Sequence, residues 1–171
     1  EIILRPKQFC NLTEVVIRPE DTLYTLEKKV KLAAILGTIQ SACTKFPYLN
    51  SDWKRNCEDE RLLGVSFTGI FDNKLMSGDF KPELEYTLTR LKEIAKKANK
   101  KWSQKLGINP SKGITCCKPS GTTSCVAGTS SGMHPRYSDY YIRRVRVDTK
   151  DPICQFMMDQ GMSYEQCKTR P

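Results

Sequence analysis

The feature that most constrains the fold is a nine-residue segment without a charged side chain, Leu62–Ile70 (LLGVSFTGI). It combines apolar and β-branched residues with two glycines, which is typical of a buried strand close to a functional site. Segments with helical patterns lie before and after it in the sequence. Strands that alternate with helices favour an α/β fold with parallel strand pairing.

Two segments space their apolar residues three or four positions apart, which predicts amphipathic helices. The first runs from about Thr22 to Thr44. The second begins at Pro82, a residue favoured in the first turn of a helix, and ends at Gly107. Most lysines of the second segment fall between its apolar positions, so we expect them on a solvated helix face.

The other expected elements are shorter, and each is delimited by proline, glycine or charged residues. They are extended chain over Ile2–Ile17, a helical turn over Asn56–Arg61, strands over Gly113–Cys117 and Tyr140–Val147, a short helix over Ser124–Ala127 closed by Gly128, and a last helix capped by Asp151 with Pro152 first and Gly161 as its stop.

Composition sets the broad class. The 171 residues suit one ordinary domain, and no apolar run approaches the roughly 20 residues of a spanning helix, so we expect a cytoplasmic protein without a membrane partner. The net charge of +9 favours polyanions in general, although nucleic acid is not the favoured partner. The eight cysteines include no CxxC pair and His134 is the only histidine, so no metal site is expected. Most thiols should be buried and inert.

The turn Lys118–Ser124 (KPSGTTS) is the strongest local signal for a binding site. It follows an expected strand, contains a glycine, and ends in three consecutive hydroxyl residues at an expected helix start. Backbone N–H groups and hydroxyls gathered there form a cradle for an anion such as phosphate. The turn matches neither the P-loop nor the GxGxxG pattern, and an ordinary capped turn remains the alternative.

Several further motifs occur in one order along nearly the whole chain. They are Glu1-Ile2-x-Leu4, Phe9-Cys10-Asn11-Leu12-Thr13-Glu14-Val15, Gly37-Thr38-x-Gln40, Thr44-x-Phe46-x-Tyr48-Leu49, Glu60-Arg61-Leu62-Leu63-Gly64-Val65-Ser66-x-Thr68-Gly69, Lys118-Pro119-Ser120-Gly121-Thr122, Ser131-Gly132-x-His134-Pro135 and Tyr141-Ile142-Arg143-Arg144-Val145-Arg146. Together they resemble the adenosylcobalamin-dependent (class II) ribonucleotide reductases, and within these the monomeric enzymes that act on ribonucleoside triphosphates.

This resemblance implies a fold and an extent. Members of the family reduce ribonucleotides to 2′-deoxyribonucleotides inside a ten-stranded α/β barrel, through a thiyl radical on a finger loop. Residues 1–171 would be the C-terminal portion of that barrel. The N-terminal half, the radical cysteine and the C-terminal redox tail would lie elsewhere, so the chain alone is expected to be inactive.

The resemblance also implies site residues and partners. Glu1 matches the glutamate that takes the proton of the 3′-hydroxyl, and Cys10 matches one member of the redox cysteine pair. The turn matches the loop that holds the substrate phosphates, through Pro119, Ser120, Gly121, Thr122, Thr123 and Ser124. Adenosylcobalamin would be bound mainly by regions outside this chain. The implied partners are a ribonucleoside triphosphate, the missing N-terminal half and a thioredoxin-like electron donor.

Two other functions stay open from the residues alone. One is a basic module without catalytic activity that binds phosphate or nucleic acid, which Tyr137, Tyr140 and Tyr141 near Arg143 would suit. The other is a dithiol regulator built on the vicinal pair Cys116-Cys117.

Overall fold

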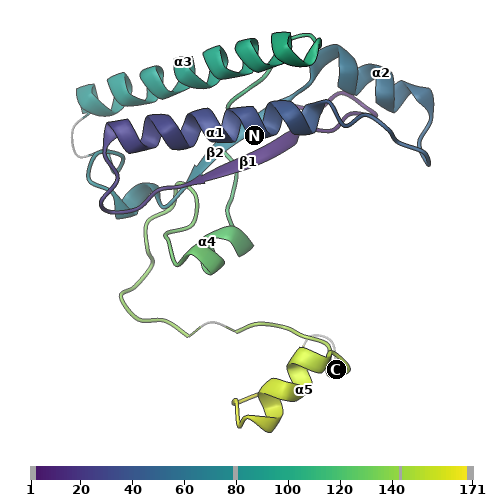
Figure 1. Cartoon of the computed structure of the whole chain (residues 1–171). Coiled ribbons are helices and arrows are strands. Elements are labelled where there is room, and N and C mark those ends of the chain that lie inside the picture. Colours follow the sequence, from purple (N-terminus) through teal and green to yellow (C-terminus); the bar gives the residue numbers. More distant parts are fainter. Residues whose placement is uncertain (1–2, 79–80, 143, 169–171) are drawn as a thin grey trace. The chain divides into compact units, whose positions relative to one another are not determined.

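A computed structural model describes residues 3–78, 81–142 and 144–168. The chain divides into two compact units, residues 1–137 and residues 138–171. The first unit contains every strand and most helices found in the described residues (Figure 1). In chain order these are β1 (Asn11–Val16), α1 (Leu23–Ser41), α2 (Ser51–Glu60), β2 (Leu63–Thr68), the 3-10 turn η1 (Ile70–Asp72), α3 (Lys81–Leu106) and α4 (Thr122–Ala127).

The sheet is parallel, as the sequence predicts. Strands β1 and β2 pair from Asn11 opposite Leu63 to Val16 opposite Thr68. On the far side of β2 a single parallel bridge joins Val65 to Thr115. Strand β2 is therefore central, whereas β1 has no partner on its outer edge within the described residues.

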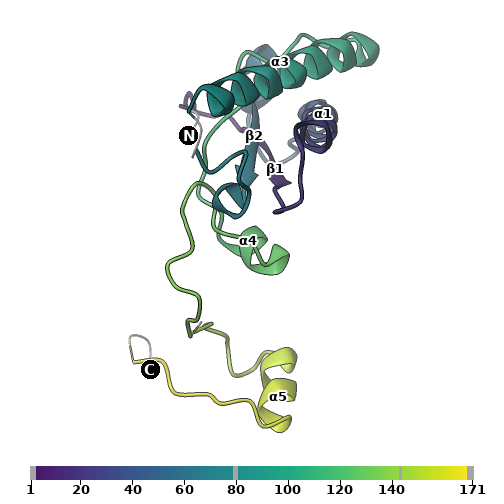
Figure 2. The same cartoon turned by 90° about the vertical axis from the view of Figure 1, so that its left-hand side faces the viewer.

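Helices α1 and α3 cover one face of this sheet, and α4 lies on the other side of the strands (Figures 1 and 2). The core between helices and strands is apolar. It includes Val15 of β1, Leu26 and Val30 of α1, Val65 of β2 and Leu91 of α3, all nearly or fully buried. Because side chains alternate along a strand, burial of Val15 and Val65 on the helix side turns their neighbours to the opposite face.

Local signals explain where the two long helices begin and how they are joined. Thr22 and Thr25 form a reciprocal capping box at the start of α1. Asn99 of α3 is fully buried and donates to Thr38 Oγ1 of α1 at 2.9 Å. Its side chain also donates to Ser111 Oγ and accepts from the Ser111 N–H, at 2.9 and 3.0 Å. This residue therefore ties α3 to α1 and to the chain that follows α3.

Three short elements differ from the sequence predictions. The helical turn expected over Asn56–Arg61 is the end of the longer helix α2. The strand expected over Gly113–Cys117 is reduced to the bridge at Thr115. The strand expected over Tyr140–Val147 is wrong for the described residues there, which are neither strand nor helix. The sequence also predicts extended chain over Ile2–Ile17, and the described residues of this segment form a regular strand only in β1. Residues 1 and 2 lie outside the described part.

The second unit contains α5 (Pro152–Asp159). Its start matches the prediction, because Asp151 Oδ1 accepts from the Ile153 N–H at 2.8 Å and Pro152 occupies the first helical position. Gly161 follows the helix with a φ of 81°. Arg144 lies 3.4 Å from the Glu165 carboxylate in an exposed ion pair. None of the helices in the described residues is long and apolar enough to cross a membrane.

Candidate active site

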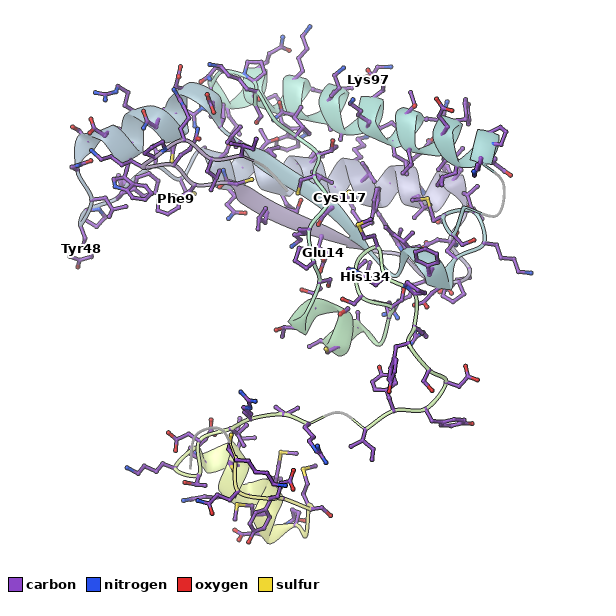
Figure 3. The ribbon with its side chains drawn as sticks, turned by 180° about the vertical axis from the view of Figure 1, so that it is seen from behind. Phe9, Glu14, Tyr48, Lys97, Cys117 and His134 are labelled. Atoms are coloured by element: carbon purple, nitrogen blue, oxygen red, sulfur yellow. The ribbon has the colours of Figure 1, made fainter. Side chains whose placement is uncertain are left out.

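The sheet face opposite α1 and α3 carries the side chains of chemical interest. Thr13 contacts the α1 side, because its Cγ2 lies 3.6 Å from the position of a Cβ built at Gly37. By strand alternation Leu12 and Glu14 face away from α1. Figure 3 shows Glu14 on this side of the sheet, whereas Lys97 projects from the outer surface of α3. We call this the inner face.

Gly64 of β2 leaves space on the inner face for two thiols. A Cβ at this position would lie 3.3 Å from Cys10 Sγ and 3.0 Å from Cys116 Sγ, and would overlap Leu12 Cδ2. The two sulfurs therefore lie beside the same glycine. Cys10 immediately precedes β1, and Cys116 belongs to the segment bridged to β2. The bridge at Thr115 brings Cys116 here, since the Cys116 N–H donates to the Val65 carbonyl at 3.0 Å.

The surroundings of Cys10 raise the pKa of its thiol. Burial is the largest effect and raises the pKa from 9.0 to about 11, with repulsion from Cys116 acting in the same direction. The Lys118 ammonium opposes both effects by attraction. A protonated, half-buried thiol suits a group that gives up hydrogen and electrons to a bound substrate. It does not suit a permanently ionised nucleophile.

The turn Lys118–Ser124 leads into α4, whose end is fixed by Gly128 in the left-handed region at a φ of 65°. Ser120 and Ser124 are buried, whereas Pro119, Gly121, Thr122 and Thr123 are exposed. Ser120 Oγ accepts from the Ser124 N–H at 3.2 Å, so these two residues hold the turn from within. The exposed residues between them are the ones a ligand can reach.

A second loop, residues 129–132, supports the turn. Thr68 Oγ1 donates to the Ser130 carbonyl at 3.0 Å and accepts from the Gly132 N–H at 2.9 Å. Gly132 has a φ of 56°, and a Cβ there would lie 3.1 Å from the Lys118 carbonyl oxygen. The loop therefore packs backbone to backbone against the turn at a position where only glycine fits.

Glu14 and Lys118 connect the turn to β1. The Ser120 hydroxyl donates to Glu14 Oε2 at 3.0 Å, and Lys118 Nζ lies 3.8 Å from Glu14 Oε1. Lys118 is thus close to a carboxylate and also acts on the Cys10 thiol. The structure therefore places Cys10, Lys118 and the turn on the same inner face.

The predicted site residues are brought together only in part. Cys10 and the turn residues Pro119–Ser124 share the inner face, whereas Glu1 lies outside the described residues. Sequence reasoning gave Glu14 no role, and it considered Cys116 only as a packing residue or as part of a dithiol pair with Cys117. A carboxylate inside the β-branched strand segment NLTEVV was the signal available for Glu14. The expectation of mostly buried thiols is wrong, since Cys57 and Cys154 are buried but three others are exposed: Cys43, Cys117 and Cys125.

Two shallow hollows contain neither Cys10 nor the turn Lys118–Ser124. A polar one between Arg5 and α2 contains none of the predicted site residues. The other runs along the outer edge of β1, lined by Thr13–Val16 and by Leu32 and Leu36 of α1. Within the described residues no group of three or more His, Cys, Asp or Glu side chains is arranged to hold a metal ion.

Comparison with known proteins agrees with the resemblance seen in the sequence. Proteins named adenosylcobalamin-dependent ribonucleoside-triphosphate reductase from Lactobacillus gasseri and Lactobacillus leichmannii are 31% and 32% identical over 192 aligned positions. A probable enzyme of the same name from Dictyostelium discoideum is 29% identical. Each alignment covers 96% of this chain. The crystal structure of a B12-dependent (class II) ribonucleotide reductase aligns with a TM-score of 0.61 and 27% identity, over 80% of this chain.

The match concerns a limited part of these larger proteins. The chain spans about a quarter of the length of the Lactobacillus relatives and 22% of the solved structure. No family model matches the chain. The sequence relatives and the solved structure nevertheless agree on one assignment. The chain is a homologue of one part of the adenosylcobalamin-dependent ribonucleotide reductases.

Proposed function

We propose that this chain forms part of the active site of a ribonucleoside-triphosphate reductase. The substrate phosphates bind at the turn Lys118–Ser124, and the ribose lies beside Cys10. The observation that carries this proposal is the shared inner face, on which Lys118 lies near Glu14 and acts on Cys10. Cys10 precedes Glu14 by four residues, which corresponds to roughly 13 Å along a strand. A nucleoside triphosphate is long enough to bridge this distance.

Cys10 supplies one half of the reducing equivalents in this proposal. Two cysteine thiols, Cys10 and a second one outside this chain, lose two protons and two electrons and form a disulfide. The 2′-hydroxyl leaves as water, and hydrogen replaces it on the ribose carbon. The thiol state of Cys10 at neutral pH supports this role, because the proton and the electrons must both be present before the reaction begins. A thioredoxin-like protein then reduces the disulfide.

Glu1 completes the proposal as the base that takes the 3′-hydroxyl proton. The relatives are adenosylcobalamin-dependent by name. Adenosylcobalamin would supply radical chemistry in the complete enzyme. The described residues do not identify a place for it: His134, the only histidine, is exposed and its Nδ1 lies 3.3 Å from the Ser131 carbonyl oxygen. We therefore propose that adenosylcobalamin would be bound mainly by regions outside this chain.

The remaining part of the barrel is the proposed partner. The outer edge of β1 lies beside the hollow lined by Leu32 and Leu36, both more than half exposed. An open strand edge next to exposed apolar side chains can accept a neighbouring strand with its covering helix. Residues 1–171 would then form one portion of the closed ten-stranded barrel.

The test combines this chain with a separately produced N-terminal portion of a homologous reductase, adenosylcobalamin, a dithiol and a ribonucleoside triphosphate. We expect deoxynucleotide formation only when both polypeptides are present, and its loss in Cys10→Ser. Cys43→Ser is the matched control, because Cys43 is an exposed thiol just after α1 and belongs neither to the turn nor to the proposed chemistry. Proven association of the two polypeptides without any product would contradict the proposal.

A simpler binding assay separates this function from a basic binding module. If the chain is part of a reductase, a ribonucleoside triphosphate should bind at the turn. Other ribonucleoside triphosphates should displace it. Stronger, salt-sensitive binding of any single-stranded DNA, without preference for the triphosphate, would favour the module instead.

A further inference from the structure

Glu14 is an unusual residue for a strand that faces an anion site. Its side chain is only 6% exposed, and its carboxylate contacts Lys118 and Ser120 of the turn. One oxygen, Oε2, accepts from the Ser120 hydroxyl at 3.0 Å. The other, Oε1, is buried and has no hydrogen-bond donor among the described residues, and the Lys118 ammonium lies 3.8 Å from it. A buried carboxylate oxygen with an incomplete set of partners is costly and calls for a functional reason.

Ser120 connects Glu14 to the rest of the turn through hydrogen bonds. Its hydroxyl donates to Glu14 and accepts from the Ser124 N–H at 3.2 Å. Its carbonyl accepts from Ser124 Oγ at 3.1 Å and from Ser131 Oγ through a short hydrogen bond. The Glu14 carboxylate, the Ser120 hydroxyl and the Ser124 amide of α4 therefore form one continuous chain of hydrogen bonds.

We propose that Glu14 is a positioning residue with two opposed effects on the turn: it clamps Ser120 against β1, and it competes with a bound polyanion for Lys118. The identity of the anion, a nucleotide phosphate, rests on the proposed function. The clamp itself needs no ligand. The 3.8 Å separation is longer than a direct hydrogen bond, so Lys118 is held loosely and can turn to a phosphate.

The two effects can be separated by substitution. Glu14→Gln keeps an oxygen that accepts from Ser120 but removes the negative charge. Glu14→Ala removes both the acceptor and the charge. Thr13→Val is the matched control, because Thr13 lies next to Glu14 on β1 but contacts the α1 side, and its buried hydroxyl has no hydrogen-bond partner within the part of the chain that the structure describes.

The first measurement is amide hydrogen exchange at Ser124 in the chain without ligand. We expect Glu14→Ala to speed exchange at least fivefold, and Glu14→Gln and Thr13→Val to change it less than twofold. Ser120→Ala should speed exchange to a similar extent, and the double variant Glu14→Ala/Ser120→Ala should add little to either single variant. Additive effects, or unchanged exchange in Glu14→Ala, would overturn the clamp. Circular dichroism checks that each variant is folded.

The second measurement is the affinity for inorganic tripolyphosphate at low salt. We expect Glu14→Gln to bind about three- to tenfold more tightly than the unchanged chain, because one negative charge close to the anion is gone. Glu14→Ala should bind less tightly than Glu14→Gln. Weaker binding by both variants would show a packing role and would overturn the charge effect. Absence of binding by the unchanged chain would overturn the charge effect together with the proposed phosphate site, and the exchange data would still decide the clamp.

Discussion

The reactivity of Cys10 provides the sharpest test of the site geometry. Burial, with a smaller effect of Cys116, raises the pKa of this thiol from 9.0 to about 11 against the attraction of Lys118. A rise of two units means about 100-fold less thiolate at any pH well below 9. Because only the thiolate is alkylated, Cys10 should react with iodoacetamide about 100-fold more slowly at pH 8 than an unperturbed cysteine.

The sign of each electrostatic effect can be tested in the same assay. Lys118→Met removes the attracting ammonium, so the pKa of Cys10 should rise further and alkylation should slow. Cys116→Ser removes a repelling thiolate, so the pKa should fall and alkylation should quicken above pH 8. Mass spectrometry of the alkylated chain from pH 7 to 11 gives a rate for each cysteine, with exposed Cys117 and Cys125 as internal references.

The same shift predicts how stability depends on pH. The folded chain holds the Cys10 proton more tightly than the unfolded chain, whose thiol has the ordinary pKa of 9.0. The resulting stabilisation is complete below that pH and is lost as the pH rises towards 11. Cys10→Ser should flatten this part of the stability profile measured by urea unfolding. Alkylation of Cys10 at pH 8 as fast as that of Cys117 would refute the reasoning from burial.

Three further substitutions test the packing that positions the site. Leu26→Ala removes a fully buried side chain and should lower the free energy of unfolding by about 2–5 kcal/mol, measured with urea. Gly64→Ala places a Cβ against Leu12, Cys10 and Cys116 and should cost about 1–3 kcal/mol, with changed alkylation of both thiols; unchanged rates would contradict the contact. Asn99→Ala leaves the Ser111 N–H without its acceptor and should cost about 1–3 kcal/mol, and full stability in this variant would show that the bond is dispensable.

The long helices could be predicted because their signals are local. The apolar spacing over Thr22–Thr44 and from Pro82 to Gly107 gives α1 and α3 to within a few residues. The sequence predicts only the end of α2, because the segment SDWKRNCEDE has little apolar pattern. Of its described side chains the helix buries only Cys57. Its stability comes instead from contacts outside the helix, such as the Asn56 side chain donating to the Pro6 carbonyl at 3.0 Å.

The candidate site could be predicted only where a residue belongs to a motif. Cys10 and the turn Lys118–Ser124 were found in this way. Glu14 and Cys116 gain their positions from the pairing of β1 with β2 and from the bridge at Thr115. A distance such as that between Glu14 and Ser120, 106 residues apart, depends on this register and is not encoded in either segment alone.

The missing strands follow from the same physical requirement. A strand is stable only when a neighbour takes up its backbone hydrogen bonds, and a parallel sheet also needs cover on both faces. In the described residues β1 lacks a neighbour on its outer edge, where Leu32 and Leu36 remain 60% and 61% exposed. Gly113–Cys117 finds only β2 and forms one bridge, and the described residues of Tyr140–Val147 form no strand at all. A sequence pattern states what a segment needs to become a strand, but it does not supply the neighbouring strand, and the described residues lack that neighbour at these two places.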